Sequence, residues 1–154
     1  MLWETPTPNF DRAFLSLMQN HYEETKRMGE RFVGQIRDPK LKTWTQTLVD
    51  DRKAALQEIG AELSSLGGAD AKALGVRKEE MAADWKGLQT RSQPSKALEA
   101  YPGLMVTNGF SAIGMAQQAL ERSKNPQVLG LARRIVAAES DRVEQLQIWM
   151  LSRK

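Results

Sequence analysis

Hydrophobic residues recur along this chain in steps of three and four, the spacing that places them on one face of an α-helix. Four such stripes are present, and each spans more than 20 residues. The stripes are Phe10, Phe14, Leu17, His21, Thr25, Met28, Phe32; then Leu41, Trp44, Leu48, Arg52, Ala55, Ile59, Leu63; then Leu98, Tyr101, Met105, Asn108, Ala112, Met115, Ala119; then Val128, Leu131, Ile135, Glu139, Arg142, Leu146, Trp149. The pattern predicts an all-α protein with four long amphipathic helices.

Turn signals separate the stripes at matching places. Asp38-Pro39 and Asn125-Pro126 each supply an N-cap side chain followed by proline at the first helical position. Proline is tolerated there because the backbone N–H that it lacks would make no hydrogen bond within the helix. Gly67-Gly68 supplies a C-cap after the second stripe. Because the links before the two prolines are short, we expect two antiparallel helical hairpins.

The second hairpin repeats the first at an offset of 87 residues without a gap. Met18 falls on Met105, Met28 falls on Met115, and the two proline turns coincide. The agreement lies in spacing and punctuation, which are the signs of an internal repeat. We expect one helical-bundle domain over residues 1–154, with repeat 1 at about 9–66, a connection at 67–94 and repeat 2 at about 95–152.

The connection between the hairpins indicates the topology. It is too long for a tight turn, and Met81, Trp85 and Leu88 are spaced for a short amphipathic helix. A four-helix bundle with one long link between its second and third helices has the connectivity of ferritin-like folds. The predicted fold is therefore a ferritin-like four-helix bundle built from two tandem helical hairpins, with a long crossover that contains a short helix.

Composition excludes several classes of function. The net charge is +3, but the 22 basic and 19 acidic side chains are interspersed, whereas nucleic-acid binders cluster their basic residues. The chain has no cysteine, and no apolar run approaches the roughly 20 residues of a membrane span. Residues 1–6 lack the plan of a signal peptide. We expect no nucleic-acid partner and no membrane span, with a periplasmic or secreted location if a leader has been removed and a cytoplasmic one otherwise.

Catalytic motifs are missing from a sequence that contains one histidine. The Glu-x-x-His pairs of di-iron bundles are absent, since the residue three before His21 is Met18. Gly67-Gly68 has no Gly-Lys-Ser/Thr sequel of a phosphate loop. A Ser–His–Asp arrangement would need His21 to activate a serine from inside a helix bundle. We predict that the protein is not an enzyme.

The residues around His21 resemble the signature of a known family. Residues 9–22 read Asn-Phe-Asp-Arg-Ala-Phe-Leu-Ser-Leu-Met-Gln-Asn-His-Tyr, with Met28 seven residues after the histidine. This stretch resembles the Asp-Arg-x-Phe and Met-x-x-His-His motifs of the domain of unknown function 305 (DUF305) family. In repeat 2, Ala112-Ile113-Gly114-Met115 is similar to the family's Ala-Ile-x-Met, and the last helix, with Trp149, is similar to its closing helix. The resemblance covers about 110 of the 154 residues.

The resemblance implies a ferritin-like bundle, usually exported, in which some members bind copper through His and Met side chains. Thioether and imidazole ligands suit Cu(I). The candidate ligands in this chain are His21, Met18, Met28, Met105 and Met115.

The chain departs from the family pattern where ligands are expected. The paired histidines become His21-Tyr22 in repeat 1 and Asn108-Gly109 in repeat 2. The closing-helix Gln and Glu become Arg52 and Ala55 in repeat 1, and Glu139 and Arg142 in repeat 2.

Polar residues interrupt all four stripes at about the same height, counted outward from the two turns. We hypothesise a mid-bundle polar layer of His21, Arg52, Asn108, Glu139 and Arg142 that occupies the place of the family's metal site. Because a buried charge is unfavourable unless paired, these side chains are expected within hydrogen-bonding or water-bridged reach of one another, at least as two linked groups. Arginine suits this role because its planar fork can satisfy several acceptors. The four methionines would then fill irregular core space.

The sequence favours a non-catalytic helical-bundle binding or scaffold protein, derived from a metal-handling family, whose ancestral metal site is degenerate. No cofactor is expected in this interpretation, and the partner is not specified by the sequence. The alternative is a copper-binding or metal-handling protein that uses His and Met ligands in the bundle core.

Overall fold

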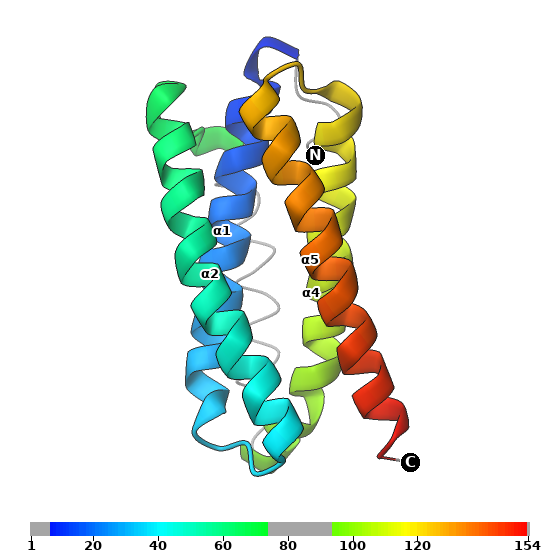
Figure 1. The fold of residues 1–154 in the computed structure, drawn as a ribbon. Coiled ribbons are helices and arrows are strands. Elements are labelled where there is room, and N and C mark those ends of the chain that lie inside the picture. The colour runs from blue at the N-terminus through cyan, green and yellow to red at the C-terminus, as the bar shows by residue number, and fades with distance from the viewer. Residues whose placement is uncertain (1–6, 74–93, 154) are drawn as a thin grey trace.

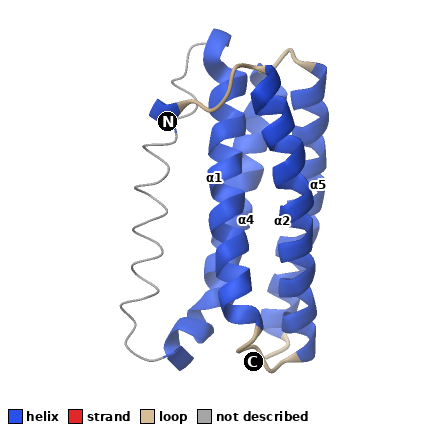
Figure 2. Cartoon of the chain, turned by 90° about the vertical axis from the view of Figure 1, so that its left-hand side faces the viewer, coloured by secondary structure: helices blue, strands red, loops and turns tan. Residues whose placement is uncertain are grey.

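Four long helices form the described part of the computed structural model, which comprises residues 7–73 and 94–153 (Figure 1). In chain order they are α1 (Thr7–Val33), α2 (Pro39–Ser65), α4 (Pro94–Arg122) and α5 (Pro126–Leu151). Two perpendicular views show them side by side along one long axis (Figures 1 and 2). The predicted all-α helical bundle is therefore confirmed. The short helix expected around Met81, Trp85 and Leu88 lies outside the described residues.

The helices pack as two hairpins laid against each other. α1 packs chiefly on α2 and α4 packs chiefly on α5, whereas the α1–α4 and α2–α5 contacts are less extensive. The α2–α5 contact forms a seam on the face shown in Figure 1. None of the helices in the described ranges is long and apolar enough to cross a membrane.

The two hairpin turns use the same capping chemistry. Asp38 accepts hydrogen bonds from the backbone N–H groups two and three residues later, at 2.9 and 3.0 Å. Asn125 does the same at the start of α5, at 2.9 and 3.3 Å. Both caps have extended backbone, and Pro39 and Pro126 occupy the first helical positions. The two predicted helix starts are thus observed, 87 residues apart.

Two glycines end α2, as the sequence predicts. Gly67 and Gly68 have φ angles of 98° and 94°, which lie in the left-handed region that side chains disfavour. The backbone N–H of Gly68 donates to the carbonyl of Leu63 at 2.7 Å, closing the helix end. Arg12 of α1 then donates to the Gly68 carbonyl at 3.1 Å, which fastens the start of α1 to this end of α2.

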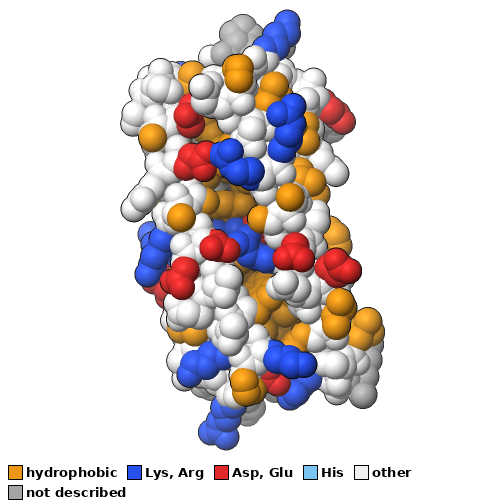
Figure 3. Space-filling view, viewed as in Figure 1, with side chains coloured by type: hydrophobic (Ala, Val, Ile, Leu, Met, Phe, Trp, Pro, Cys, Tyr) orange, Lys and Arg blue, Asp and Glu red, His pale blue; other side chains and the backbone are white. Residues whose placement is uncertain are grey.

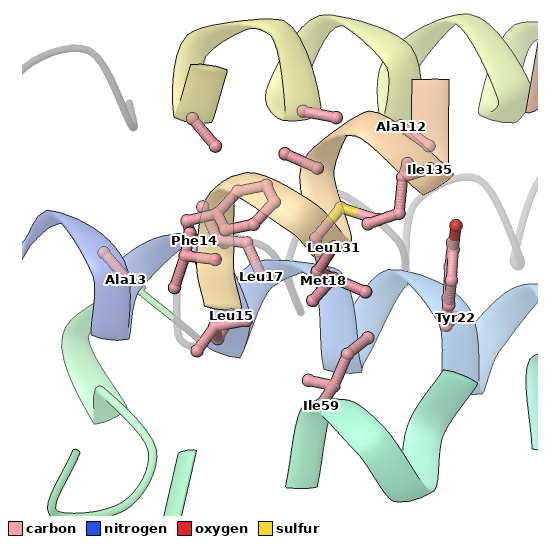
Figure 4. Packing of buried hydrophobic residues seen from close by; sticks show 14 of the residues in the cluster. Ala13, Phe14, Leu15, Leu17, Met18, Tyr22, Ile59, Ala112, Leu131 and Ile135 are labelled. Carbon is pink, nitrogen blue, oxygen red and sulfur yellow. The ribbon is translucent and has the colours of Figure 1, made fainter. Parts of the chain in front are cut away.

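Two hydrophobic clusters fill the bundle on either side of its middle. In the first, side chains from all four helices meet, including Phe14, Ile59, Ala112 and Leu131 (Figure 4). The second lies toward the Asp38-Pro39 turn, and in it the rings of Phe32 and Tyr101 are 5.0 Å apart at their centroids. The seven α1 stripe residues are all buried, so the predicted periodicity identifies the buried face of this helix correctly. The polar residues that interrupt the stripes lie between the two clusters.

Candidate functional site

A buried ion pair joins α2 and α5 in the middle of the bundle. Nη1 of Arg52 contacts Oε1 of Glu139, and the two side chains are only 3% and 2% exposed. The Tyr22 hydroxyl donates to the same carboxylate oxygen at 3.0 Å, and the Tyr22 ring lies under the guanidinium, 3.7 Å from its Cζ. Nε of Arg52 donates to Oγ1 of Thr25 at 3.2 Å. Three helices therefore supply the groups that compensate both buried charges.

Arg142 connects this centre to the surface of the seam. Its Nη1 lies 3.3 Å from Oε1 of Glu139, and its Nη2 contacts the exposed carboxylate of Asp51 on α2. Nε1 of Trp44 donates to the Arg142 backbone carbonyl at 3.1 Å. On this face, charged side chains cross the middle of the seam with apolar side chains above and below them (Figure 3).

The environment holds each group of the centre in one protonation state. Burial alone would raise the pKa of Glu139, but the charges of Arg52 and Arg142 and the hydrogen bonds from Arg52 and Tyr22 outweigh it, so the pKa lies below its ordinary value. Burial opposes the charged form of Arg52 as well, yet Tyr22 and Glu139 raise its pKa. Burial also raises the pKa of Tyr22. Near neutral pH, a carboxylate therefore accepts from two guanidinium groups and a protonated phenol.

Of the five residues predicted for the polar layer, Arg52 and Arg142 both contact Glu139 directly. His21 is fully buried in α1, and its backbone carbonyl accepts from Oγ1 of Thr25 at 3.0 Å. Asn108 is buried in α4, and its amide nitrogen has no hydrogen-bond partner within the described ranges. A series of hydrogen bonds thus connects Glu139 through Arg52 and Thr25 to the backbone of His21.

Sequence reasoning missed Tyr22 as a member of the polar layer. Tyr22 lies one position off the α1 stripe, so periodicity gave no reason to place it in the layer, although the family motif has a histidine there. Both arginines of the predicted layer, Arg52 and Arg142, contact the carboxylate of Glu139. The structure places Arg52 closer to the carboxylate and leaves Arg142 nearer the surface.

The candidate copper-binding methionines are divided between the two hydrophobic clusters. Met18 belongs to the cluster of Figure 4, and Met115 packs against that cluster. Met28 and Met105 belong to the other cluster. Between the clusters lies the guanidinium of Arg52, whose positive charge opposes a second cation there. No grouping of three or more His, Asp or Glu side chains suited to a metal occurs in residues 7–73 and 94–153.

The positions that match the family's second histidine both border Glu139. Tyr22 donates to this carboxylate, as described above. A Cβ added at Gly109, 87 residues later, would collide with Cγ2 of Val143 and lie 3.8 Å from Oε2 of Glu139. Arg52 and Glu139 are themselves 87 residues apart, so matching positions of the two repeats meet each other. When two similar units are related by a two-fold axis, matching residues of the two units meet each other at that axis.

Comparisons with known proteins bear on the fold. No family model matches the chain, and no curated protein matches its sequence. Its structure is similar to the crystal structure of a DUF305 fragment from Deinococcus radiodurans, with a TM-score of 0.71 and 15% sequence identity over 97% of this chain and 98% of that chain. At this identity the likeness shows a shared fold, and the fold that the resemblance implies is confirmed.

Proposed function

We propose that this protein is a non-catalytic helical-bundle binding or scaffold protein, in which an internal ion-pair network takes the place of the metal site of its metal-handling relatives. The observation that carries the proposal is the buried pair of Arg52 and Glu139. A carboxylate in a protein interior requires a cation, and either a metal or a guanidinium can supply one. In this chain the guanidinium of Arg52 neutralises Glu139, and the methionines serve as packing residues.

The protonation states at the centre support the absence of acid–base catalysis. A general acid or base works best with a pKa near the operating pH. The pKa of Glu139 is lowered and that of Tyr22 is raised, so both move away from neutrality. Both side chains are also buried, which keeps them from a substrate. These properties suit a structural centre that fixes the helices and leaves the outer surface for binding.

A competition experiment with Cu(I) tests the proposal against the copper alternative. Protein purified without a His-tag is titrated against a Cu(I) chelator, beside His21→Ala and Met18→Leu variants. We expect no stoichiometric Cu(I) on any of the three, because the thioethers are divided between two clusters. A saturable site on the wild type that is lost in His21→Ala would overturn the proposal and establish the copper-binding function.

A further inference from the structure

A groove opens on the half of the α2–α5 seam that lies next to the C-terminal end of α5. It has a volume of about 650 Å³, and its apolar wall is formed by Leu41, Trp44, Leu146, Ile148 and Trp149. This half of the seam contains the first turns of α2 and the last turns of α5. The indole N–H groups of Trp44 and Trp149 are both hydrogen-bonded, to the Arg142 carbonyl and to Asp38, so the two rings are held in place.

The last turn of α5 exposes apolar side chains beside this groove. Ile148 and Leu151 are 60% and 65% exposed, and Phe110 is the other exposed large hydrophobic residue in the described ranges. Figure 3 shows apolar side chains gathered in the seam and around the C-terminal end of α5. A contiguous apolar surface of this kind is typical of a protein interaction site.

The matching half of the seam, 87 residues away in register, is bridged by an ion pair. There the side chains of Glu58 and Arg134 contact each other across α2 and α5. The corresponding positions in the groove are Gln145 and Thr47, which line it. Where the groove has Trp149, the other half has a glutamate. The two tryptophans of the groove therefore have no aromatic counterparts in the other half, where the matching residues are Leu131 and Glu62.

The charged side chains that line the groove are basic. Lys40 and Arg142 line it, and no Asp or Glu is among its described lining residues. Arg142 is already paired with Glu139 and Asp51, so Lys40 supplies the charge that is available to a partner. On the other side of Trp149, the adjoining hollow is lined by Arg37 and Arg153 together with Asp38 and Glu99. Asp38 is already neutralised by Arg153, at 2.9 Å. The charge of Lys40 in the groove lining is complementary to an acidic partner.

We propose that this groove docks an acidic amphipathic helix of a partner protein, an inference that rests on the proposed binding or scaffold function and names its partner chemistry. The α5 wall from Arg142 to Ser152 is about 15 Å long, which accommodates two to three turns of a helix. Apolar residues of that helix, spaced by three and four, pack on Trp44, Ile148 and Trp149. Its carboxylates face Lys40 and the cations beside the groove.

The test uses a fluorescein-labelled, 18-residue designed helix with leucine on one face and glutamate on the other. The matched probe has the same leucines with lysine in place of glutamate. In fluorescence anisotropy titrations we expect the glutamate peptide to bind and the lysine peptide to bind at least about tenfold more weakly, with the difference shrinking at high salt. Equal binding of the two peptides, or preference for the lysine peptide, would overturn the proposal.

Variants of exposed residues locate the binding surface without disturbing the core. Ile148→Glu should weaken binding of the glutamate peptide at least about tenfold, and Lys40→Glu several-fold. The matched controls are Phe110→Glu, an exposed apolar residue away from the groove lining, and Lys53→Glu, the same charge change elsewhere on α2. Both controls should leave the Kd within about twofold of wild type. Equal losses in a variant and its control would contradict the proposed location.

Two further measurements separate this inference from neighbouring ones. Vesicles of mixed anionic and neutral phospholipid are titrated in parallel, and Ile148-dependent binding to vesicles without binding to the glutamate peptide would replace the helix by a lipid surface. The Cu(I) competition is run on the same protein. If copper binds while the peptide still depends on Ile148, the metal-free function fails and the groove stands. If neither copper nor the glutamate peptide binds, the groove inference alone fails.

Discussion

Two ion pairs between arginine and glutamate connect α2 and α5, one inside the bundle and one on its surface. Arg52 and Glu139 are 3% and 2% exposed, whereas Arg134 and Glu58 are 61% and 45% exposed. The residue types and the helices are the same. Burial is the difference, and it determines what each pair can contribute. An exposed pair is solvated and screened by salt, while neither member of a buried pair can be removed without leaving an uncompensated charge.

The buried pair also has partners that the exposed pair lacks in the described structure. Tyr22, Thr25 and Arg142 add hydrogen bonds to its carboxylate or its guanidinium. These bonds offset the desolvation of the two charges. The comparison therefore predicts that substitutions lower the free energy of unfolding most at the buried pair and least at the surface of the seam.

The largest effect is expected from Glu139→Ala. The substitution leaves the guanidinium of Arg52 buried without its carboxylate, so the free energy of unfolding should fall by about 3–5 kcal/mol. Denaturant melts at neutral pH measure the loss. A loss below about 1 kcal/mol would mean that water reaches the site and that the pair is not dry.

The matched control removes both charges. In the Arg52→Met, Glu139→Leu double variant no uncompensated charge remains, so most of the lost stability should return. Glu139→Ala with Arg142→Met should recover less, because Arg142 lies nearer the surface and contacts Asp51 as well. If the two double variants recover equally, Arg52 is not the principal partner of the carboxylate.

A smaller loss is expected from adding a methyl group beside the buried pair. The Cβ of Gly109→Ala would collide with Cγ2 of Val143, a stiff side chain, so α4 and α5 must separate next to Glu139. Overpacking of this kind destabilises by about 1–3 kcal/mol. Beside the exposed pair, a Cβ at Gly130 meets only Nη1 of Arg134, at 3.7 Å. Gly130→Ala should therefore be neutral or stabilising by thermal melt, and similar losses at both glycines would contradict this account.

Acid should weaken the buried pair before it disrupts the helices. The pKa of Glu139 in the folded protein lies below its ordinary value of 4.5, so its contribution is fully present above about pH 4.5 and is lost as the pH falls through the lower folded value. Urea melts at a series of pH values should show the free energy of unfolding falling as the pH drops below about 4.5. Glu139→Gln should have the lower stability at neutral pH and the shallower decline in acid.

A second carboxylate makes this variant comparison necessary. The pKa of Asp38 is also lowered, first by the hydrogen bond from the backbone of Leu41. Asp38 is present in both proteins, so the difference between their pH profiles isolates Glu139. Identical slopes for wild type and Glu139→Gln would show that this carboxylate does not titrate differently on folding.

The smallest effect is expected at the surface of the seam. Glu58→Ala breaks only the exposed pair with Arg134 and should change the free energy of unfolding by less than about 0.5 kcal/mol. High salt should abolish even this difference, while the loss in Glu139→Ala should persist because its site is shielded from ions. A loss above about 1 kcal/mol in Glu58→Ala would show that the exposed pair has a structural role.

Local features of this fold follow from the sequence because they depend on residues close together in the chain. The α1 stripe identifies its buried face, since the helical period alone sets which residues share it. Asp38 and Asn125 cap their helices with bonds that reach only two and three residues ahead. Gly67-Gly68 ends α2 because a left-handed backbone favours glycine.

The partners at the centre were decided by the tertiary structure. The sequence shows that Arg52, Glu139 and Arg142 interrupt apolar stripes, and it places them at about the same height. The sequence does not show that Arg52 is the cation closest to Glu139 or that Tyr22 donates to the same carboxylate. Both contacts depend on how α1 and α2 are rotated and shifted against α5. These quantities are set by packing between helices far apart in the chain, and periodicity within one helix does not contain them.

The same reason explains the methionines and the groove. Met18 and Met28 lie ten residues apart on α1, so the rise of the helix alone separates them by about 15 Å. Which methionine of α4 joins each of them is decided by the antiparallel packing of α1 and α4, which places Met115 with Met18 and Met105 with Met28. Trp44 and Trp149 each read as core aromatics from their own stripes. That they line a groove depends on how α2 and α5 lie against each other, because the distance between two helices is fixed by every side chain packed between them.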